Sequence, residues 1–187
     1  MSATSAVLVP RYAFADELAS SIVHGIGIVL SIIGLAVLVA LAALHGDTLT
    51  VTACAVYGTS LILLYTASTL YHAVSLAAAK PVLRALDHIA IYVLIAGTYT
   101  PFTLLALPAR WGWSLFAAVW LLALAGSALE LGFLQRYRKL AVLLNVGMGW
   151  IGMLAFQPLS QHLQFGGLAL LIGGGLAYTL GVPFYLW

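Results

Sequence analysis

Residues 18–46 decide the fold class, and they read LASSIVHGIGIVLSIIGLAVLVALAALHG. The stretch contains no Asp, Glu, Lys or Arg. An α-helix needs ~20 consecutive apolar residues to cross a bilayer, so this run is long enough to span one. It is also longer than the apolar core of a secretory signal peptide, which has about 7–15 residues. We therefore expect it to remain in the protein as the first membrane-spanning helix.

The same pattern continues along the rest of the chain. Charge-free runs cover residues 48–79, 88–109, 111–129 and 140–187, and the last is long enough for two helices. Only 6% of the 187 residues are charged, against ~25% in soluble domains. This composition excludes a soluble domain, and continuous apolar runs argue against a membrane β-barrel, whose strands alternate in polarity. The sequence predicts an all-α, polytopic membrane helix bundle that forms a single transmembrane domain over residues 1–187.

Charged and turn-forming residues divide the runs into six predicted transmembrane helices. Pro81 is expected to keep the segment 80–84 out of a helix, because proline cannot occupy a helix interior without losing a hydrogen bond. The polar segment 157–162 is expected to separate the last two helices. The predicted helices are 19–44, 49–76, 86–107, 111–131, 140–156 and 165–187.

Small residues in these helices are expected to serve packing. Cys54 lies inside an apolar run and is interpreted as a small core residue. Glycines recur in the last two helices, and small residues on one stripe let helices approach closely. The glycines interpreted as packing faces are Gly147, Gly149 and Gly152 in the fifth helix and Gly167, Gly174 and Gly181, together with Gly173 and Gly175, in the sixth.

Lysine and arginine are concentrated on one side of the predicted bundle. With six helices, Arg110 falls on one side, and the side that holds the N-terminus carries Arg11, Lys80, Arg84, Arg136, Arg138 and Lys139. Cytoplasmic loops carry the excess of Lys and Arg, so the N-terminus is predicted to be cytoplasmic. The net charge of +2 is too small to indicate nucleic-acid binding, and the expected partners are membrane lipids.

Polar side chains inside the predicted helices gather near the cytoplasmic side. Ser68 and His72 lie one turn apart on the second helix, with Ser75 on the same face. Polar groups inside a membrane bundle cost free energy, so their placement marks candidate functional sites. The residues predicted to reach a similar depth there are His24, His72, Asp87 and His88.

The chemistry of this group points to a zinc site. Neutral imidazole is a common zinc ligand, and a catalytic zinc takes three protein ligands and a water. Zinc lowers the pKa of the bound water to about 7, and a nearby carboxylate such as Asp87 accepts its proton. Ser68, one turn before His72, would orient the imidazole or polarise a substrate carbonyl.

Each of these residues also has an ordinary structural explanation. A histidine near a helix end commonly makes a structural hydrogen bond. Asp87 would suit the first turn of a helix, with Arg84 close enough to pair with it. Glu130 is expected to pair with Arg136 or Arg138, or to reach the interface. Spacing alone leaves the metal site and these structural roles open.

Three segments resemble the hemolysin III family, which is the bacterial branch of the progestin and adipoQ receptors. They are Glu17–Gly27 (ELASSIVHGIG), Ser68–His72 (STLYH) and Leu86–Pro101 (LDHIAIYVLIAGTYTP). Gly149-Trp150 and the segment 175–187 (GLAYTLGVPFYLW) fit as well, so the resemblance covers about residue 16 to the end. The pairing of Ser-x-x-x-His with Leu-Asp-His is the most specific of these features.

The resemblance implies a seven-helix bundle with a zinc site near the cytoplasmic face of the bacterial inner (plasma) membrane. Carried over by motif, His72 would be a metal ligand, Asp87 would hold or deprotonate the zinc-bound water, and Ser68 would be the accompanying serine. A distant relation to membrane ceramidases implies a zinc-dependent hydrolase of lipid amide or ester bonds. The alternatives are a non-enzymatic lipid-binding or receptor-like membrane regulator and, from the family name only, a pore-forming cytolysin.

The sequence departs from the family pattern at its C-terminal end. The resemblance places two further zinc ligands in a His-x-x-x-His pair on a seventh helix, and no such pair occurs here. The chain ends at Trp187, so we expect an incomplete chain or a six-helix variant. His24 and His88 would replace the missing ligands only after a rearrangement.

Overall fold

The computed structural model describes residues 14–133 and 136–186 and contains six membrane-length helical segments within them. This confirms the predicted all-α bundle with six candidate spans. Arg11 and Trp187, which entered the sequence-based expectations, lie outside the described residues. The elements are α1 (Phe14–His45), α2 (Thr48–Ala73), α3 (Lys80–Leu105), α4 (Ala109–Glu130), α5 (Arg138–Trp150), the 3₁₀ helix η2 (Ile151–Ala155), α6 (Phe156–His162) and α7 (Phe165–Leu186).

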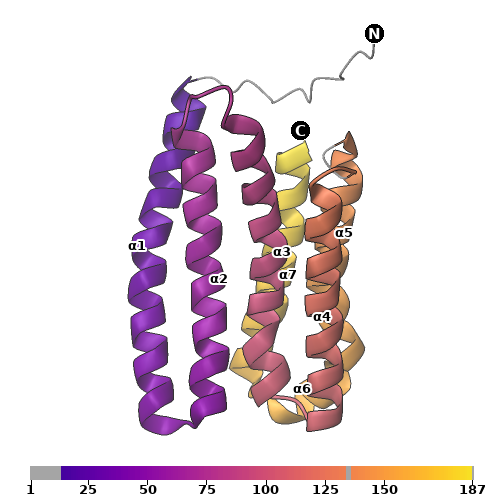
Figure 1. Cartoon of the computed structure of the whole chain (residues 1–187). Coiled ribbons are helices and arrows are strands. Elements are labelled where there is room, and N and C mark those ends of the chain that lie inside the picture. The colour runs from indigo at the N-terminus through magenta and orange to yellow at the C-terminus, as the bar shows by residue number, and fades with distance from the viewer. Residues whose placement is uncertain (1–13, 134–135, 187) are drawn as a thin grey trace.

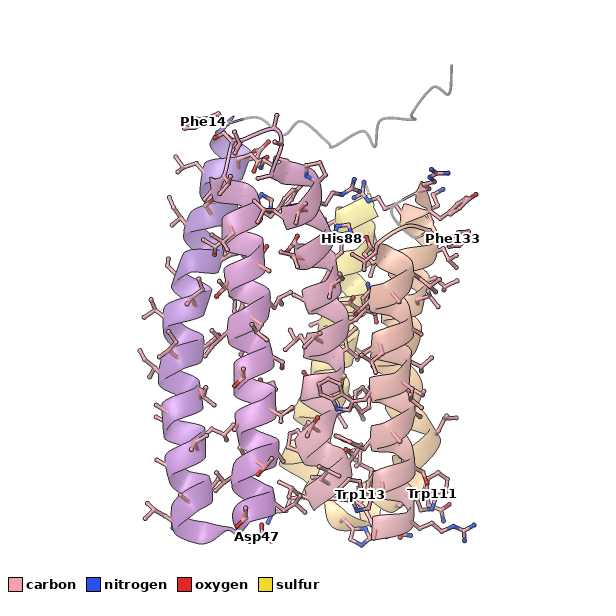
Figure 2. All side chains as sticks on the ribbon, viewed as in Figure 1. Phe14, Asp47, His88, Trp111, Trp113 and Phe133 are labelled. Atoms are coloured by element: carbon pink, nitrogen blue, oxygen red, sulfur yellow. The ribbon has the colours of Figure 1, made fainter. Side chains whose placement is uncertain are left out.

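Helices that follow one another in the chain run up and down side by side (Figure 1). α1 packs on α2, α2 on α3 and α3 on α4, while α5 contacts α3, α4 and α7. Phe14 and Phe133 lie at one end of the bundle, and Asp47, Trp111 and Trp113 lie at the other (Figure 2). We call the first the basic end, because its helix ends and loops carry Lys80, Arg84, Arg136, Arg138 and Lys139.

Large apolar side chains cover the outside of the bundle. Leu30 is 63% exposed and Leu170 is 80% exposed. The residues buried between helices are small by comparison, as Ala53, Ala96 and Ala123 show. This arrangement suits a bilayer, where lipid solvates apolar side chains and small residues bring helix backbones together.

Only some glycines lie where helices touch. A Cβ added at Gly97 would collide with the Ser60 side chain, so α2 and α3 meet at a distance that glycine alone permits. The predicted packing role is wrong for Gly174 and Gly181 of α7, because a Cβ at either would meet nothing within 4 Å. It is confirmed for Gly175 of α7, which lies against the Trp150 ring of α5.

Two predicted helix boundaries are also wrong. The segment 80–84 is helical, because Pro81 occupies the first turn of α3, where a missing backbone donor costs nothing. Asp87 therefore lies about two turns inside α3, so a first-turn position does not explain it. α2 ends at Ala73, which leaves Ser75 outside the helix and exposed.

The fifth span changes from α-helix to 3₁₀ helix in the middle of its length. η2 separates α5 from α6, and the polar segment 157–162 belongs to α6 rather than breaking the helix. Hydrocarbon cannot satisfy the backbone groups that such a change releases. The Tyr99 hydroxyl does so: it donates to the Gly149 carbonyl at 2.6 Å and accepts from the Gly152 amide at 2.9 Å. Tyr99 therefore ties α3 to the irregular segment.

Candidate functional site

Four of the predicted polar residues come together near the basic end. His24 from α1 lies 2.9 Å from the Ser68 hydroxyl of α2, measured from Nδ1 to Oγ. The rings of His24 and His72 have centroids 5.7 Å apart. The side chain of Asp87 on α3 lies close to Ser68. We call His24, Ser68, His72 and Asp87 the polar cluster.

Ser68 is the centre of this cluster. Ser68 is 6% exposed, and its hydroxyl lies close to both His24 and Asp87. Its contact with His24 Nδ1 at 2.9 Å fixes an imidazole of α1 against α2. The one-turn spacing of Ser68 and His72 then adds the second imidazole on the same face of α2.

His72 is held by a second set of contacts. Its Nδ1 lies 3.1 Å from Oε2 of Glu17, so the proton on Nδ1 is donated to that carboxylate. Lys80 Nζ donates to both Glu17 oxygens, at 3.1 and 3.0 Å, and to the Tyr71 carbonyl at 2.6 Å. Because the three helices α1, α2 and α3 each contribute to this network, it fixes the His72 ring and places the proton on Nδ1.

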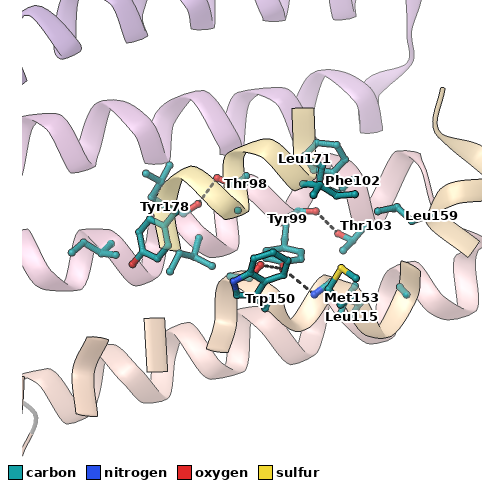
Figure 3. Close-up of a pocket in the computed structure, with 18 of the residues that line it drawn as sticks. Thr98, Tyr99, Phe102, Thr103, Leu115, Trp150, Met153, Leu159, Leu171 and Tyr178 are labelled. Carbon is teal, nitrogen blue, oxygen red and sulfur yellow. Dashed lines mark hydrogen bonds between the residues drawn. The ribbon is translucent and has the colours of Figure 1, made fainter. Parts of the chain in front are cut away.

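A long cavity begins at the polar cluster. It has a volume of about 650 Å³ and is lined by all four cluster residues at one end. Along α3 it extends from Asp87 to Thr103, which corresponds to about 24 Å of helix rise. Figure 3 shows Phe102 and Leu171 toward the Leu159 side of the cavity and Tyr178 toward the other. The remainder of the lining is mainly apolar, with Leu107, Leu115, Met153, Phe156 and Leu159 at the far end.

His88, which was expected to join the cluster, lies in a different environment. It pairs with Glu130, with Nδ1 2.7 Å from Oε1, and it lines a second cavity. Glu130 is 1% exposed, so it does not reach the interface as expected. Its Oε1 contacts His88 instead of the expected loop arginine. α3 therefore presents Asp87 and His88 to two different cavities.

Several residues of the site were not singled out from the sequence. Glu17 precedes the predicted site residue His24 by one heptad on the first helix, a signal that was visible but received no role. Tyr99 and Trp150 line the cavity, and the Trp150 indole donates to Thr179 Oγ1 at 2.9 Å. In the sequence, these two aromatic residues look like any others that pack between membrane helices. No sequence pattern therefore marked them as site residues.

The zinc ion implied by the family resemblance does not fit the described donors. Among residues 14–133 and 136–186, no group of three or more His, Cys, Asp or Glu side chains is placed to hold a metal ion. No chemical step below is therefore assigned to a metal.

The Glu17 contact predicts the tautomer of His72. In Glu17→Ala the carboxylate that accepts the Nδ1 proton is lost, so neutral His72 should shift towards the Nε2–H form that isolated imidazoles favour. Nitrogen-15 chemical shifts of labelled histidine, measured in detergent above the imidazole titration, report this change. Asp16→Ala is the matched control, because Asp16 is the exposed neighbour of Glu17. An unchanged His72 spectrum in Glu17→Ala would contradict the positioning role.

Comparisons with known proteins show which family the chain belongs to. The family model described as Haemolysin-III related matches residues 12–187. Hemolysin-3 of Bacillus cereus is 43% identical over 172 residues, which are 92% of this chain and 78% of that protein. The Hemolysin-3 homolog of Bacillus subtilis (strain 168) is 41% identical over 172 residues, or 92% and 81% of the two chains. No solved structure matches. The chain is a multi-span membrane protein that belongs to the haemolysin III family.

Proposed function

We propose that this protein binds a lipid with one long hydrocarbon chain in the cavity and hydrolyses an amide or ester bond at the polar cluster. The observation that carries the proposal is the shape and polarity of the cavity, which joins four polar side chains to a long apolar channel. A volume of about 650 Å³ lies within the ~300–1,000 Å³ usual for small-molecule sites. An amphipathic chain fits both parts at once.

Selectivity is expected to reside at the polar end. A hydrocarbon chain that leaves the bilayer for an apolar cavity exchanges one apolar environment for another, so little free energy comes from that transfer. The polar group of the lipid gains more, because it meets His24, Ser68 and His72 in a region of low dielectric constant. The polar cluster therefore determines which headgroup binds. The apolar channel determines that this headgroup carries a single long hydrocarbon chain.

The proposed chemistry uses the carboxylate of Asp87 as a general base. Water attacks the carbonyl carbon, its proton passes to Asp87, and the same proton then leaves with the amine or alcohol when the acyl bond breaks. The Ser68 hydroxyl lies close to this carboxylate. His72, fixed by Glu17, presents its imidazole to the same end of the cavity. Zinc dependence is not part of this proposal, because the described donors do not complete a metal site.

Removing the proposed base tests the hydrolysis directly. Asp87→Asn should lower kcat for long-chain N-acyl or O-acyl lipids by about 100-fold or more, the usual contribution of a general base. Product release is measured in proteoliposomes by mass spectrometry. Thr98→Val is the control: Thr98 lines the cavity, but its hydroxyl is bound to the Leu94 carbonyl of its own helix at 2.8 Å.

The outcomes of this assay separate the candidate functions. Turnover that persists in Asp87→Asn would contradict the proposed base. Saturable lipid binding by the wild type without turnover would contradict hydrolysis and support the receptor-like alternative. The relatives carry the name hemolysin, and dye leakage from liposomes that contain the wild-type protein would instead favour a pore-forming activity.

We further propose that the basic end faces the cytoplasm and that the chain resides in the bacterial inner membrane. This rests on the gathering of Lys80, Arg84 and the 136–139 segment at that end, opposite Arg110. Green fluorescent protein fused to the N-terminus should fluoresce, and alkaline phosphatase fused after Gly46 should be active. Phosphatase activity at the N-terminal fusion and none after Gly46 would reverse the orientation.

A further inference from the structure

A second cavity adjoins the long cavity at Ile91 and Tyr178, and no residue of the polar cluster lines it. It has a volume of about 300 Å³, and α3, α4, α5 and α7 all contribute to its walls. Its polar lining comes from Arg84, His88, Glu130, Arg138, Asn145 and Tyr178. Ile91, Val142, Ala177 and Val182 supply much of the rest. None of the polar residues takes part in the chemistry proposed above.

Two buried oxygen acceptors in this cavity have no hydrogen-bond partner in the described structure. They are Oε2 of Glu130 and Oδ1 of Asn145, in residues that are 1% and 6% exposed. His88 satisfies the other oxygen of Glu130 at 2.7 Å. A buried acceptor without a donor costs free energy, and the cost rises in a membrane, where lipid chains offer no donor. The site therefore calls for a ligand that brings N–H or O–H donors.

Cationic side chains occupy the same cavity. Arg84 lies near the start of α3, and Arg138 is the first residue of α5. Guanidinium groups bind phosphate oxygens with two parallel hydrogen bonds. A ligand that satisfies the whole lining carries both a donor-rich cation, for Glu130 and Asn145, and an anionic phosphate, for the arginines.

The position of the cavity along the bundle axis indicates where such a ligand comes from. Arg84 and Arg138 lie near the start of their helices, while Glu130 and Gly181 lie near the end of theirs, so all four are at the basic end. Figure 2 shows His88 near the same end as Phe14 and Phe133. This is the depth at which lipid headgroups meet the ends of transmembrane helices.

We propose that this cavity binds the headgroup of a phospholipid that carries a primary ammonium and a phosphate. The ammonium donates to Glu130 Oε2 and Asn145 Oδ1, and the phosphate accepts from Arg84 and Arg138. A quaternary ammonium of similar charge has no N–H group and leaves both acceptors unsatisfied. The site thus discriminates a primary amine from its trimethylated counterpart.

Lipid retention by the full chain tests this assignment. The protein is purified from mixed micelles that contain phosphatidylethanolamine, phosphatidylcholine and phosphatidylglycerol with identical acyl chains, and bound lipid is counted by native mass spectrometry. Phosphatidylethanolamine should be retained about tenfold over each of the others, the effect of one charge-assisted hydrogen bond. Asn145→Leu should remove most of this preference, whereas Met148→Leu, one turn along the same buried face of α5, should keep it.

Each alternative result overturns a stated part of the proposal. Equal retention of the ethanolamine and choline lipids means that no donor from the headgroup reaches Glu130 and Asn145. Equal retention of the ethanolamine and glycerol lipids means that hydroxyl donors serve the site as well as an ammonium, which contradicts the preference for a primary amine. Displacement of the bound lipid by low concentrations of soluble phosphoethanolamine would assign the site to a soluble ligand. A preference that survives in both Asn145→Leu and Glu130→Gln places the lipid elsewhere on the protein.

Discussion

Hydrocarbon offers no hydrogen-bonding partner, so every polar group within the bundle must find its partner in the protein. This constraint explains why so few polar residues organise so much of the structure. Ser68 joins α2 to His24 of α1, Glu17 joins His72 to Lys80, and each of these contacts crosses from one helix to another. Without them, the small residues between α1, α2 and α3 would permit close packing but would not fix the rotation of each helix.

The same constraint shapes the far part of the bundle. η2 interrupts the α-helical hydrogen bonds of the fifth span, and the Tyr99 hydroxyl replaces two of the lost partners. Tyr99 also lines the long cavity. The same residue therefore stabilises the irregular backbone of the fifth span and forms part of the cavity wall beside it. Trp150 and Thr179 hold α7 to the end of α5 in a similar way. Polar contacts thus keep the walls of an apolar channel in place.

The sequence allowed the number and approximate extent of the spans to be predicted, because charge-free runs of membrane length leave few alternatives. It also predicted that His24, His72, Asp87 and His88 lie at a similar depth, since helical periodicity and loop positions determine depth. Periodicity does not determine which neighbouring helix a face meets. For that reason the separation of His88 from the cluster and its pairing with Glu130 were not predicted. The helical start of α3 was missed because Pro81 was interpreted as a helix breaker rather than as a first-turn residue.

The central claim is that a hydrocarbon chain enters the long cavity with its polar group at the polar cluster. A long-chain amide that carries a photoactivatable diazirine at the end of its chain tests this most directly, with crosslinked residues identified by mass spectrometry. The account predicts competable labelling at the far end of the cavity, around Phe102, Leu115 and Leu159. Labelling confined to outward-facing residues such as Leu30 and Leu170, and unaffected by excess unlabelled amide, would contradict it.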